Sequence, residues 1–409
     1  MNATKNKKIP EEFLYYIWEN RLFDANNLTT TQGESIEIVD VGRKNIDSGP
    51  DFFNSKIKID DTLWAGNVEI HHKSSDWIAH KHHQDNAYNN VILHVVEQED
   101  KVLKRANQFF IPTLTIKYPE SLKENYWQLI NGQGWIACEE EINKINALKI
   151  RLGFNRLMIE RLENKTQSVL NTLKQNDNDW NETFYQMLLQ IFGFKTNAVP
   201  FELLSKSLPL RVLSKHYYMQ LRKEHLFLAK KYQLKPIQAH LWKFMRLRPS
   251  NFPTVRIAQL AQLIHQSSAL FSKILEINKV EDLIQLFKVE ASEYWSTHYS
   301  FNKQSKKKSI KRMGISGIHI IIINVVVPFL FVYGEQQNQH YLKDRAINFL
   351  ENLPAEKNSI INRWSNLNIK AQSAFDSQAL LQLKNVYCNT KKCLNCHIGN
   401  QLFKLNLAQ

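Results

Sequence analysis

The sequence has no apolar segment near its N-terminus and no uninterrupted apolar run long enough to cross a bilayer. Its opening residues, MNATKNKKIPEEFLYYIWEN, lack the hydrophobic region of a secretory signal, so export is not expected. The longest apolar run, Ile318 to Tyr333, contains His319, Asn324 and Pro328 and falls short of the roughly 20 residues that a spanning helix needs. We therefore expect a buried helix or a pair of strands there, no membrane partner, and a cytoplasmic location.

Cysteine is scarce as well, with four residues in 409, three of them close together near the C-terminus. So few cysteines do not make the disulfide framework of a small secreted protein, and they favour a reducing compartment. No internal repeat of fixed period is present either. These absences leave an intracellular globular protein as the expected class.

What the sequence does have is enough chain for more than one core, and an excess of positive charge. At 409 residues two or three domains are expected, and 43% hydrophobic with 22% charged residues is ordinary for a globular protein. The 53 Lys and Arg against 39 Asp and Glu give a net charge of +14. That balance suits nucleic acid as a partner, and it suits equally a merely basic surface. The one sharp concentration, KKKSIKR at Lys306 to Arg312, is expected to be an exposed linker.

Hydrophobic periodicity predicts an α+β chain whose strands lie in the N-terminal part. A helix is expected over residues 10–23, and then an antiparallel meander of strands in SIEIVDVG, FFNSKIKI and LWAGNVEIH. A helical segment opening at SSDW leads to two more strands, VILHVVEQ and TLTIKY, and helical patterns dominate from Pro119 onward. We expect an α/β domain at 1–120, a helical domain at 121–304, and a helical segment with the cysteine cluster at 305–409.

The densest group of chemistry-bearing residues lies in GPDFFNSKIKIDDTLWAGNVEIHHKSSDW. Asp51 stands at the mouth of one predicted strand. Glu69 and His71 share a face of the next, because residues two apart in a strand point the same way. Two strand-borne carboxylates can hold Mg²⁺ or Mn²⁺ with room for water and a substrate phosphate. The alternative is structural: Asp51 caps a turn and Glu69 pairs with a lysine on a solvated face.

Histidine is concentrated beside these carboxylates, since six of the 14 histidines fall between residues 71 and 94. If the HKHHQD segment is helical, His80 and His83 face one direction and could bind zinc or line a groove for phosphates. Asp85 is a secondary candidate next to them. His94, inside the apolar VILHVV, is more typical of a hydrogen-bonded core histidine. A zinc hydrolase built on these histidines is one functional hypothesis.

The C-terminal cysteines form a second candidate metal site. Cys388, Cys393 and Cys396 are spaced as C-x₄-C-x₂-C in YCNTKKCLNCHIGN, and the chain's other cysteine is Cys138. Thiolates at these spacings can close on one soft metal. Three alternatives stay open: Zn²⁺ held by four Cys or by three Cys and His397, an iron–sulfur cluster held by four Cys, and free thiols. A metal here would be structural, because no ligand position is left open.

Residues 12–117 resemble the PD-(D/E)XK nuclease superfamily, in which an Asp opens a hairpin and the following strand carries an acidic residue, one spacer and a Lys. Here Asp51, after Pro50, supplies the first element, and Glu69-Ile70-His71 supplies the second. The resemblance implies a restriction-endonuclease-like fold with Mg²⁺ or Mn²⁺ at Asp51 and Glu69, and cleavage of nucleic-acid phosphodiesters.

The same resemblance assigns roles to further residues. Glu12 or Glu19 of the leading helix would supply the extra acid that many members carry. His71 stands where the superfamily has lysine, with Lys73 two residues on along the same face, so either would steady the attacking water. Some members also carry an iron–sulfur cluster that joins cysteines far apart in sequence, and the separation of Cys138 from the C-terminal cysteines is similar.

Several motifs taken together resemble, almost end to end, the bacterial family catalogued as domain of unknown function 2851. They are GRKNIDSGPDF, GNVEIHHKSSDW, RPSNFPTVRIAQL, the DSQALLQL of Asp376 to Leu383, and the YC…CLNC ending. This resemblance implies no activity, so the function has to be argued from the site. We expect a metal-dependent, nuclease-like protein. The alternative is a non-catalytic nucleic-acid-binding or scaffold protein that keeps the nuclease-like fold.

Overall fold

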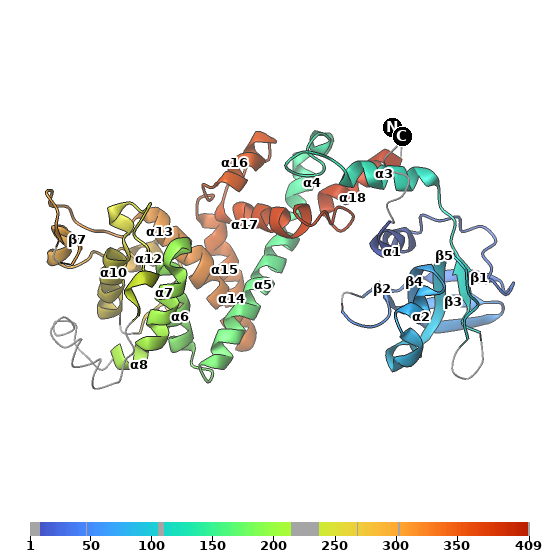
Figure 1. The fold of residues 1–409 in the computed structure, drawn as a ribbon, viewed down its shortest axis with the longest axis horizontal. Coiled ribbons are helices and arrows are strands. Elements are labelled where there is room, and N and C mark those ends of the chain that lie inside the picture. Colours follow the sequence, from blue (N-terminus) through green and yellow to red (C-terminus); the bar gives the residue numbers. More distant parts are fainter. Residues whose placement is uncertain are drawn as a thin grey trace. The chain divides into compact units, whose positions relative to one another are not determined.

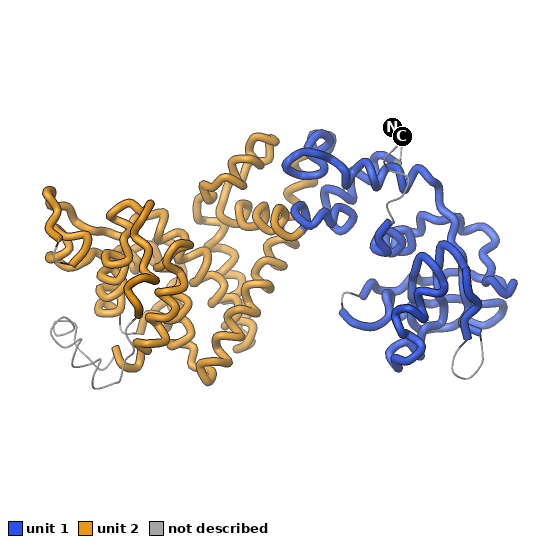
Figure 2. Tube along the Cα trace, viewed as in Figure 1, with its two compact units in different colours: residues 1–145, 387–409 blue, residues 146–386 orange. Residues whose placement is uncertain are grey.

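The chain divides into two compact units that interleave in sequence (Figure 2). The computed structural model describes residues 9–45, 47–104, 110–213, 237–267, 269–301 and 303–407. Unit 1 combines Met1–Ile145 with Tyr387–Gln409, and unit 2 is Asn146–Val386. The two units are defined by contacts within the folded chain. The sequence pattern predicted a different division, with boundaries after residues 120 and 304. The C-terminal cysteines therefore belong to the same unit as Cys138.

Unit 1 is built on a curled mixed sheet, as the α+β pattern of the sequence predicted (Figure 1). The strand order is β1-β3-β4-β5-β6, and β2 pairs with β3 beside β1. The strands are β1 (Ile36–Asp40), β2 (Arg43–Lys44), β3 (Phe52–Ile59), β4 (Thr62–Lys73), β5 (Val91–Gln98) and β6 (Thr113–Thr115). The three strands of the expected meander are thus β1, β3 and β4, and the two later strands are β5 and β6.

The register of the sheet brings polar residues into its interior. β3 is antiparallel to β4, with Phe52 opposite Val68, and β4 is parallel to β5, with Glu69 opposite His94. The second half of β4, from Val68 to His72, and most of β5 are buried whichever way their side chains point. A strand covered on both faces normally carries apolar residues throughout. The acidic and imidazole groups on these two strands therefore need a special explanation.

Short helical segments connect and cover the strands of unit 1. Helix α1 packs its apolar face, including Phe13, Leu14 and Ile17, inward, and it contacts β4. The C-terminal helix α18 contacts α3, so the end of the chain closes onto this unit. The helical elements are α1 (Glu11–Glu19), α2 (Asp76–Ala79), the 3₁₀ turns η1 (His82–Gln84), η2 (Asn86–Tyr88) and η3 (Ile142–Lys144), α3 (Glu120–Ile130) and α18 (His397–Leu407).

Unit 2 is almost entirely helical, as predicted for the region after residue 119. Its core includes a cluster of aromatic rings in which Phe184, Phe271 and Phe329 contact one another. Its helices are α4 (Ala147–Leu152), α5 (Phe154–Gln175), α6 (Trp180–Phe192), α7 (Phe194–Ser207), α8 (Leu210–Leu213), α10 (Pro253–Gln266), α11 (Leu270–Glu276), α12 (Val280–Leu286), α13 (Ile315–Ile321), α14 (Val327–Gln336), α15 (His340–Asn352), α16 (Ser359–Asn366) and α17 (Ala374–Gln382). Shorter elements are η5 (Ala239–Leu241), η6 (Pro249–Asn251), η7 (Glu293–Ser296), β7 (His298–Ser300), β8 (Lys303–Gln304), and the π-helical η8 (Ile322–Val326) and η9 (Leu383–Cys388).

The apolar run predicted as a buried helix or two strands is one helix, Ile315–Gln336, made of α13, η8 and α14. Among the described residues it alone is long and apolar enough, by length and composition, to cross a membrane. However, 72% of its most apolar stretch is buried inside the protein. Pro328 lacks an N–H and cannot bond to the Asn324 carbonyl, which agrees with the π-helical turn just before it.

Candidate metal centre

Asp51 and Glu69 are locked together by reciprocal hydrogen bonds. Asp51 immediately precedes β3 and Glu69 lies on the neighbouring β4. The backbone N–H of Asp51 donates to Glu69 Oε2 at 3.1 Å, and the backbone N–H of Ile70 donates to Asp51 Oδ2 at 2.9 Å. Both carboxylates are therefore held by the β3–β4 pairing itself, and neither forms an ion pair with a Lys or Arg of the described chain.

Burial makes both carboxyl groups unusually basic. The pKa of Glu69 is raised to about 8, mainly by loss of water, and Glu69 is only 4% exposed. The pKa of Asp51 is raised to about 7 by the same desolvation and then by the charge of Glu69. The hydroxyl of Tyr15, on α1, hydrogen-bonds to the Asp51 carboxylate, and its pKa is raised far above the usual value by burial and by Asp51. Without a bound cation, this pair is partly protonated near neutral pH.

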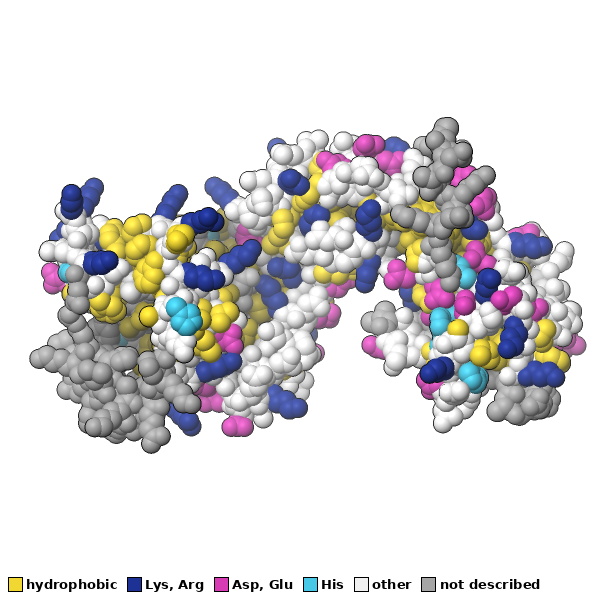
Figure 3. All heavy atoms as spheres, viewed as in Figure 1, with side chains coloured by type: hydrophobic (Ala, Val, Ile, Leu, Met, Phe, Trp, Pro, Cys, Tyr) yellow, Lys and Arg dark blue, Asp and Glu magenta, His cyan; other side chains and the backbone are white. Residues whose placement is uncertain are grey.

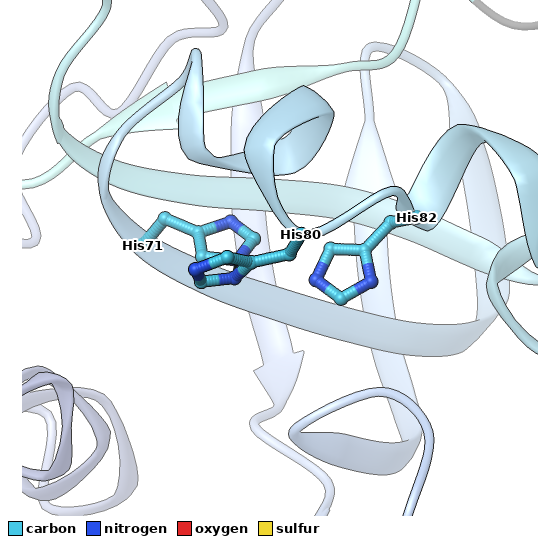
Figure 4. A group of neighbouring side chains, drawn as sticks. All are labelled: His71, His80 and His82. Carbon is cyan, nitrogen blue, oxygen red and sulfur yellow. Dashed lines mark hydrogen bonds between the residues drawn. The ribbon is translucent and has the colours of Figure 1, made fainter.

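Three histidines lie close together beside Glu69, and Figure 4 shows their rings. His71 lies on β4 beyond Glu69, His80 ends α2, and His82 opens η1. One ring nitrogen from each lies within 4.8 Å of the others. His71 Nε2 is 3.1 Å from His80 Nδ1, and Glu69 Oε1 is 3.2 Å from His82 Nε2 and 3.5 Å from His71 Nε2.

The local chain path explains why His80 and His82 lie together. Lys81, between them, has a left-handed backbone with φ of 63°, so the helix stops at His80 and the chain reverses. The ring of His82 then stacks on Tyr88 with centroids 3.8 Å apart and meets the edge of Trp77. These aromatic contacts restrict the orientation of His82.

A fourth histidine supports His71 from behind. His94, fully buried on β5, places Nε2 2.9 Å from His71 Nδ1, so the second ring nitrogen of His71 is held while Nε2 faces the cluster. Burial, followed by the neighbouring histidines, lowers the pKa of His71 to about 2, and burial lowers that of His94 to about 3. Both rings are therefore neutral at physiological pH, which is the state in which imidazole binds metal. His94 is the core histidine expected from the sequence, but it also positions a site residue.

The donor set would suit a transition metal. Three imidazoles with one or two carboxylates match the preferences of Zn²⁺, Mn²⁺ or Fe²⁺, and imidazole is a poor ligand for Mg²⁺. A supporting hydrogen bond to the far nitrogen of a ligand histidine, as His94 makes to His71, is the usual way in which such a ring is oriented. The cluster thus offers both ligands and the groups that hold them.

Three predicted site residues lie outside this cluster. Glu12 is on the exposed side of α1, where its charge acts on Tyr126 of α3. Lys73 is exposed at the end of β4. Asp85 is also exposed and accepts a hydrogen bond from the N–H of Ala87 at 2.9 Å, which makes it the N-cap of η2.

Three further residues take part that the sequence did not single out for a role: Glu11, Tyr15 and His82. Glu11 and Tyr15 are four residues apart on α1, and the charge of Glu11 acts on Asp51 and Glu69. The i, i+4 spacing was the available signal, but the choice of helix face required the sheet beneath. The predicted helical pairing of His80 with His83 is wrong, because the turn at Lys81 leaves His83 exposed beside Gln84.

Three cysteines of the second candidate site, Cys138, Cys393 and Cys396, lie near one another in unit 1. Cys138, Cys393 and Cys396 are buried, and Cys388 is half-buried. Burial raises the pKa of Cys138 well above its usual value and that of Cys393 to about 12, and in each case the charge of Cys396 contributes. The thiols are therefore close enough to influence one another across a large sequence separation.

The fold and the centre define a mixed α+β protein with a carboxylate–histidine cluster, in which Glu69 and His71 are buried, His82 is half-buried and His80 is exposed. The family described as Protein of unknown function (DUF2851) matches residues 11–217 and 213–359, and the chain belongs to this family. No curated protein and no solved structure matches the chain. The matched residues contain the entire carboxylate–histidine cluster and Cys138, and they end before the DSQALLQL motif and the C-terminal cysteines.

Proposed function

We propose that unit 1 is a metal-dependent phosphodiesterase that acts on nucleic acid, with a transition metal held by His71, His80, His82 and Glu69. The observation that carries the proposal is the grouping of three imidazoles, two of them within 3.5 Å of a buried carboxylate that has no lysine or arginine partner among the described residues. Buried ionisable groups normally pair with each other or bind a cation. A divalent cation would replace the protons that Glu69 and Asp51 otherwise retain.

The metal would supply Lewis acidity and lower the pKa of a water molecule. The residues of this chain would have two further roles, positioning the ion and transferring protons. Glu69 and the three histidines position the ion, and Asp51, with a pKa near 7 and a hydrogen bond from Tyr15, is suited to accept and return a proton. His94 keeps the His71 ring in place. Because Mn²⁺ accepts both carboxylate and imidazole, it suits this set better than the Mg²⁺ considered from sequence.

The nuclease resemblance is supported by the order of elements. Helix α1, three antiparallel strands, a helical segment and a parallel strand follow one another in unit 1. Asp51 and Glu69 stand at the two acidic positions of the motif, and His71 takes the place of the lysine. A specific observation, the exposure of Lys73, favours the alternative of a nucleic-acid-binding protein without catalysis, because no lysine then replaces the missing one.

Metal content tests the site directly. Elemental analysis of the purified chain, followed by calorimetric titration of the metal-free protein with Mn²⁺ and Zn²⁺, should give one ion bound at the carboxylate–histidine cluster, apart from any metal at the cysteines. His80→Ala should weaken that binding at least tenfold. His83→Ala removes an exposed histidine three residues away and serves as the matched control, expected to bind as the wild type does. Equal affinity in all three proteins would exclude the site.

Cleavage tests the activity. Labelled single-stranded and duplex DNA and RNA are incubated with Mn²⁺, Zn²⁺ or Mg²⁺, and Glu69→Gln should abolish any metal-dependent cleavage. If the wild type binds metal and nucleic acid but cuts none of these substrates, the catalytic proposal fails and the binding alternative stands.

We also propose that the cysteines hold a structural metal, either Zn²⁺ or an iron–sulfur cluster, with Cys138, Cys393, Cys396 and Cys388 as ligands. The burial and mutual proximity of thiols from distant parts of the sequence support this. Protein purified without oxygen should contain iron with a brown chromophore or one colourless zinc in addition to the first site. Cys138→Ser should remove it, and absence of both metals would refute the proposal.

A further inference from the structure

A projecting segment of unit 2, Glu290–Arg312, is closed at its base like a clasp. Glu290 and Arg312 form an antiparallel bridge, the N–H of Ala291 donates to the Lys311 carbonyl at 3.1 Å, and the N–H of Met313 donates to the Val289 carbonyl at 2.9 Å. Within the segment β7 and β8 pair as a short hairpin. The sequence predicted an exposed linker here. The segment is exposed, but its backbone is held by these hydrogen bonds and strand pairings. We call it the lysine hairpin (β7 in Figure 1).

A buried lysine fixes the loop of this hairpin. Lys311 is 4% exposed, and its Nζ donates to the Ser309 carbonyl at 2.9 Å and to Ser309 Oγ at 2.6 Å while lying 4.0 Å from the centroid of the Tyr299 ring. The N–H of Ser309 donates to the Ser296 carbonyl at 2.8 Å, and Trp295 packs in a core cluster with Val255. The loop between β8 and Lys311 is thus fixed at both ends.

The fixed loop presents charge to solvent with little to neutralise it. Lys303, Lys306, Lys307 and Lys308 are all exposed, and Figure 3 shows dark blue side chains at the outer tip of this hairpin. Among described residues, only Lys308 of these four has an acidic partner, Glu293 at 3.9 Å, and both groups are largely exposed. Such a pair contributes little. The hairpin therefore presents four exposed lysines on a loop that hydrogen bonds hold at both ends.

Aromatic rings accompany these lysines. Phe301, 60% exposed, contacts the buried Trp295 edge-on, with ring centroids 5.1 Å apart. Tyr294 stacks on His298 with centroids 4.1 Å apart and nearly parallel ring planes. Rings beside a row of basic groups are the feature by which proteins bind single-stranded nucleic acid, because bases stack on the rings and phosphates meet the lysines.

We propose that the lysine hairpin binds the phosphate backbone of single-stranded nucleic acid. The inference rests on the proposed function and deepens it, since it assigns the nucleic-acid strand a second contact, on unit 2. Preorganisation strengthens the case, because a loop already ordered loses little entropy on binding. A lysine contacts phosphate as a point charge without reading sequence, so binding is expected to be independent of base order.

The test measures binding of the full chain to fluorescein-labelled oligothymidylate by anisotropy, in EDTA, between about 50 and 200 mM salt. The variant replaces Lys303, Lys306, Lys307 and Lys308 with Gln. A matched control replaces four other exposed lysines of unit 2 with Gln and so has the same net charge: Lys273, Lys279, Lys357 and Lys370. The hairpin variant should bind at least tenfold more weakly, with a salt slope shallower by about 3. The control should change less than threefold.

Equal weakening of the two variants, or unchanged binding of the hairpin variant, would overturn the inference. So would a loss confined to cosedimentation with phosphatidylserine–phosphatidylcholine vesicles, which would assign the hairpin to a membrane surface. Because EDTA removes the metal, the binding result is independent of catalysis. Cleavage that persists with unchanged binding would refute only the hairpin, and hairpin-dependent binding without cleavage would refute only the phosphodiesterase.

Discussion

Each unit contains a cluster of ionisable side chains that are partly or fully buried. The two clusters differ in whether their charged groups have partners of opposite charge. In unit 2, Lys165 donates from Nζ to Asn324 Oδ1 at 3.1 Å and to Gln378 Oε1 at 3.2 Å. Gln378 also accepts from Arg161 Nε and donates to Glu356, whose charge favours both cations. In unit 1, the carboxylates and imidazoles of the candidate metal centre have no such cationic partner among described residues.

This difference distinguishes a cluster with a structural role from one with a functional role. A polar network whose members hydrogen-bond to one another needs no ligand and contributes to the specificity of the packing, even though burial and the charge of Arg161 lower the pKa of Lys165 to about 7. In the candidate metal centre, the lowered pKa of His71 keeps its ring uncharged, and the raised pKa of Glu69 favours its protonated form. The charge of Glu69 is therefore removed by a proton taken from water, and no cationic side chain balances it. Perturbed groups of the second kind are typical of functional sites. The predictions below test that contrast, starting with the largest effect.

Among the replacements that leave the metal bound, Asp51→Asn should have the largest effect on the cleavage rate. Asp51→Asn keeps the shape of the side chain but removes the carboxyl that titrates near pH 7, so the rate of metal-dependent cleavage should fall about 10²–10⁴-fold. Single-turnover cleavage with Mn²⁺ measures the effect. Asp47→Asn, an exposed residue four positions earlier, is the control and should leave the rate unchanged. Comparable rates for Asp51→Asn and the wild type would remove Asp51 from the chemistry.

The stability of metal-free unit 1 should fall as the pH rises from 6.5 to 8. The pKa values of Asp51 and Glu69 are about 7 and 8 in the folded chain and near 4 when unfolded, so the folded state holds more protons in this range. The loss should be about 2 kcal/mol. His71 and His94 act in the opposite direction, because the unfolded chain still protonates them partly at pH 6.5, but together they offset less than about 1 kcal/mol of this loss.

Urea denaturation of the metal-free protein at both pH values checks this. Glu69→Gln should remove most of the slope, since it deletes the more basic carboxyl. Saturating Mn²⁺ should reverse the trend, because metal binding competes with those protons. A flat profile without metal would mean that the two carboxylates have a partner in solution.

Breaking the unit 2 network should cost stability without touching the metal. Gln378 is 1% exposed, and Gln378→Leu removes one acceptor from both Lys165 and Arg161 and one donor from Glu356. We expect a loss of about 1–3 kcal/mol in the unfolding of unit 2 and unchanged Mn²⁺ affinity. Gln337→Leu, on the exposed end of α14, is the control. Weaker metal binding in the Gln378 variant would show that the two clusters are coupled.

Much of unit 1 was readable from the sequence. Period-two alternation located β3 and the first half of β4, and the apolar run located β5. Alternation also put Glu69 and His71 on one face, which is the part of the centre that depends on a single strand. The pairing of Asp51 with Glu69 followed from the hairpin between their strands.

What the sequence missed depends on contacts between elements or on unusual backbone. Residues 76–84 contain a four-residue helix and a 3₁₀ turn joined by a left-handed lysine, so helical spacing chose His83 where the chain presents His82. Glu11 was overlooked in favour of Glu12 because the helix period alone does not say which face meets the sheet. The lysine hairpin had too few strand residues to be distinguished from a linker.

The smallest effect is expected from Lys73, although the nuclease resemblance allows it a catalytic role. Lys73 shares the strand face of Glu69 and His71 but is exposed at the end of β4, beyond the buried part of the strand. An exposed ammonium stays hydrated and stabilises developing charge weakly, so Lys73→Ala should change the cleavage rate less than about threefold. The rate is compared with that of His71→Ala, which removes a buried ring and should lose both metal and activity. A large loss in Lys73→Ala with metal still bound would mean that the end of β4 folds inward when substrate binds, and that function here does not depend on the buried groups alone.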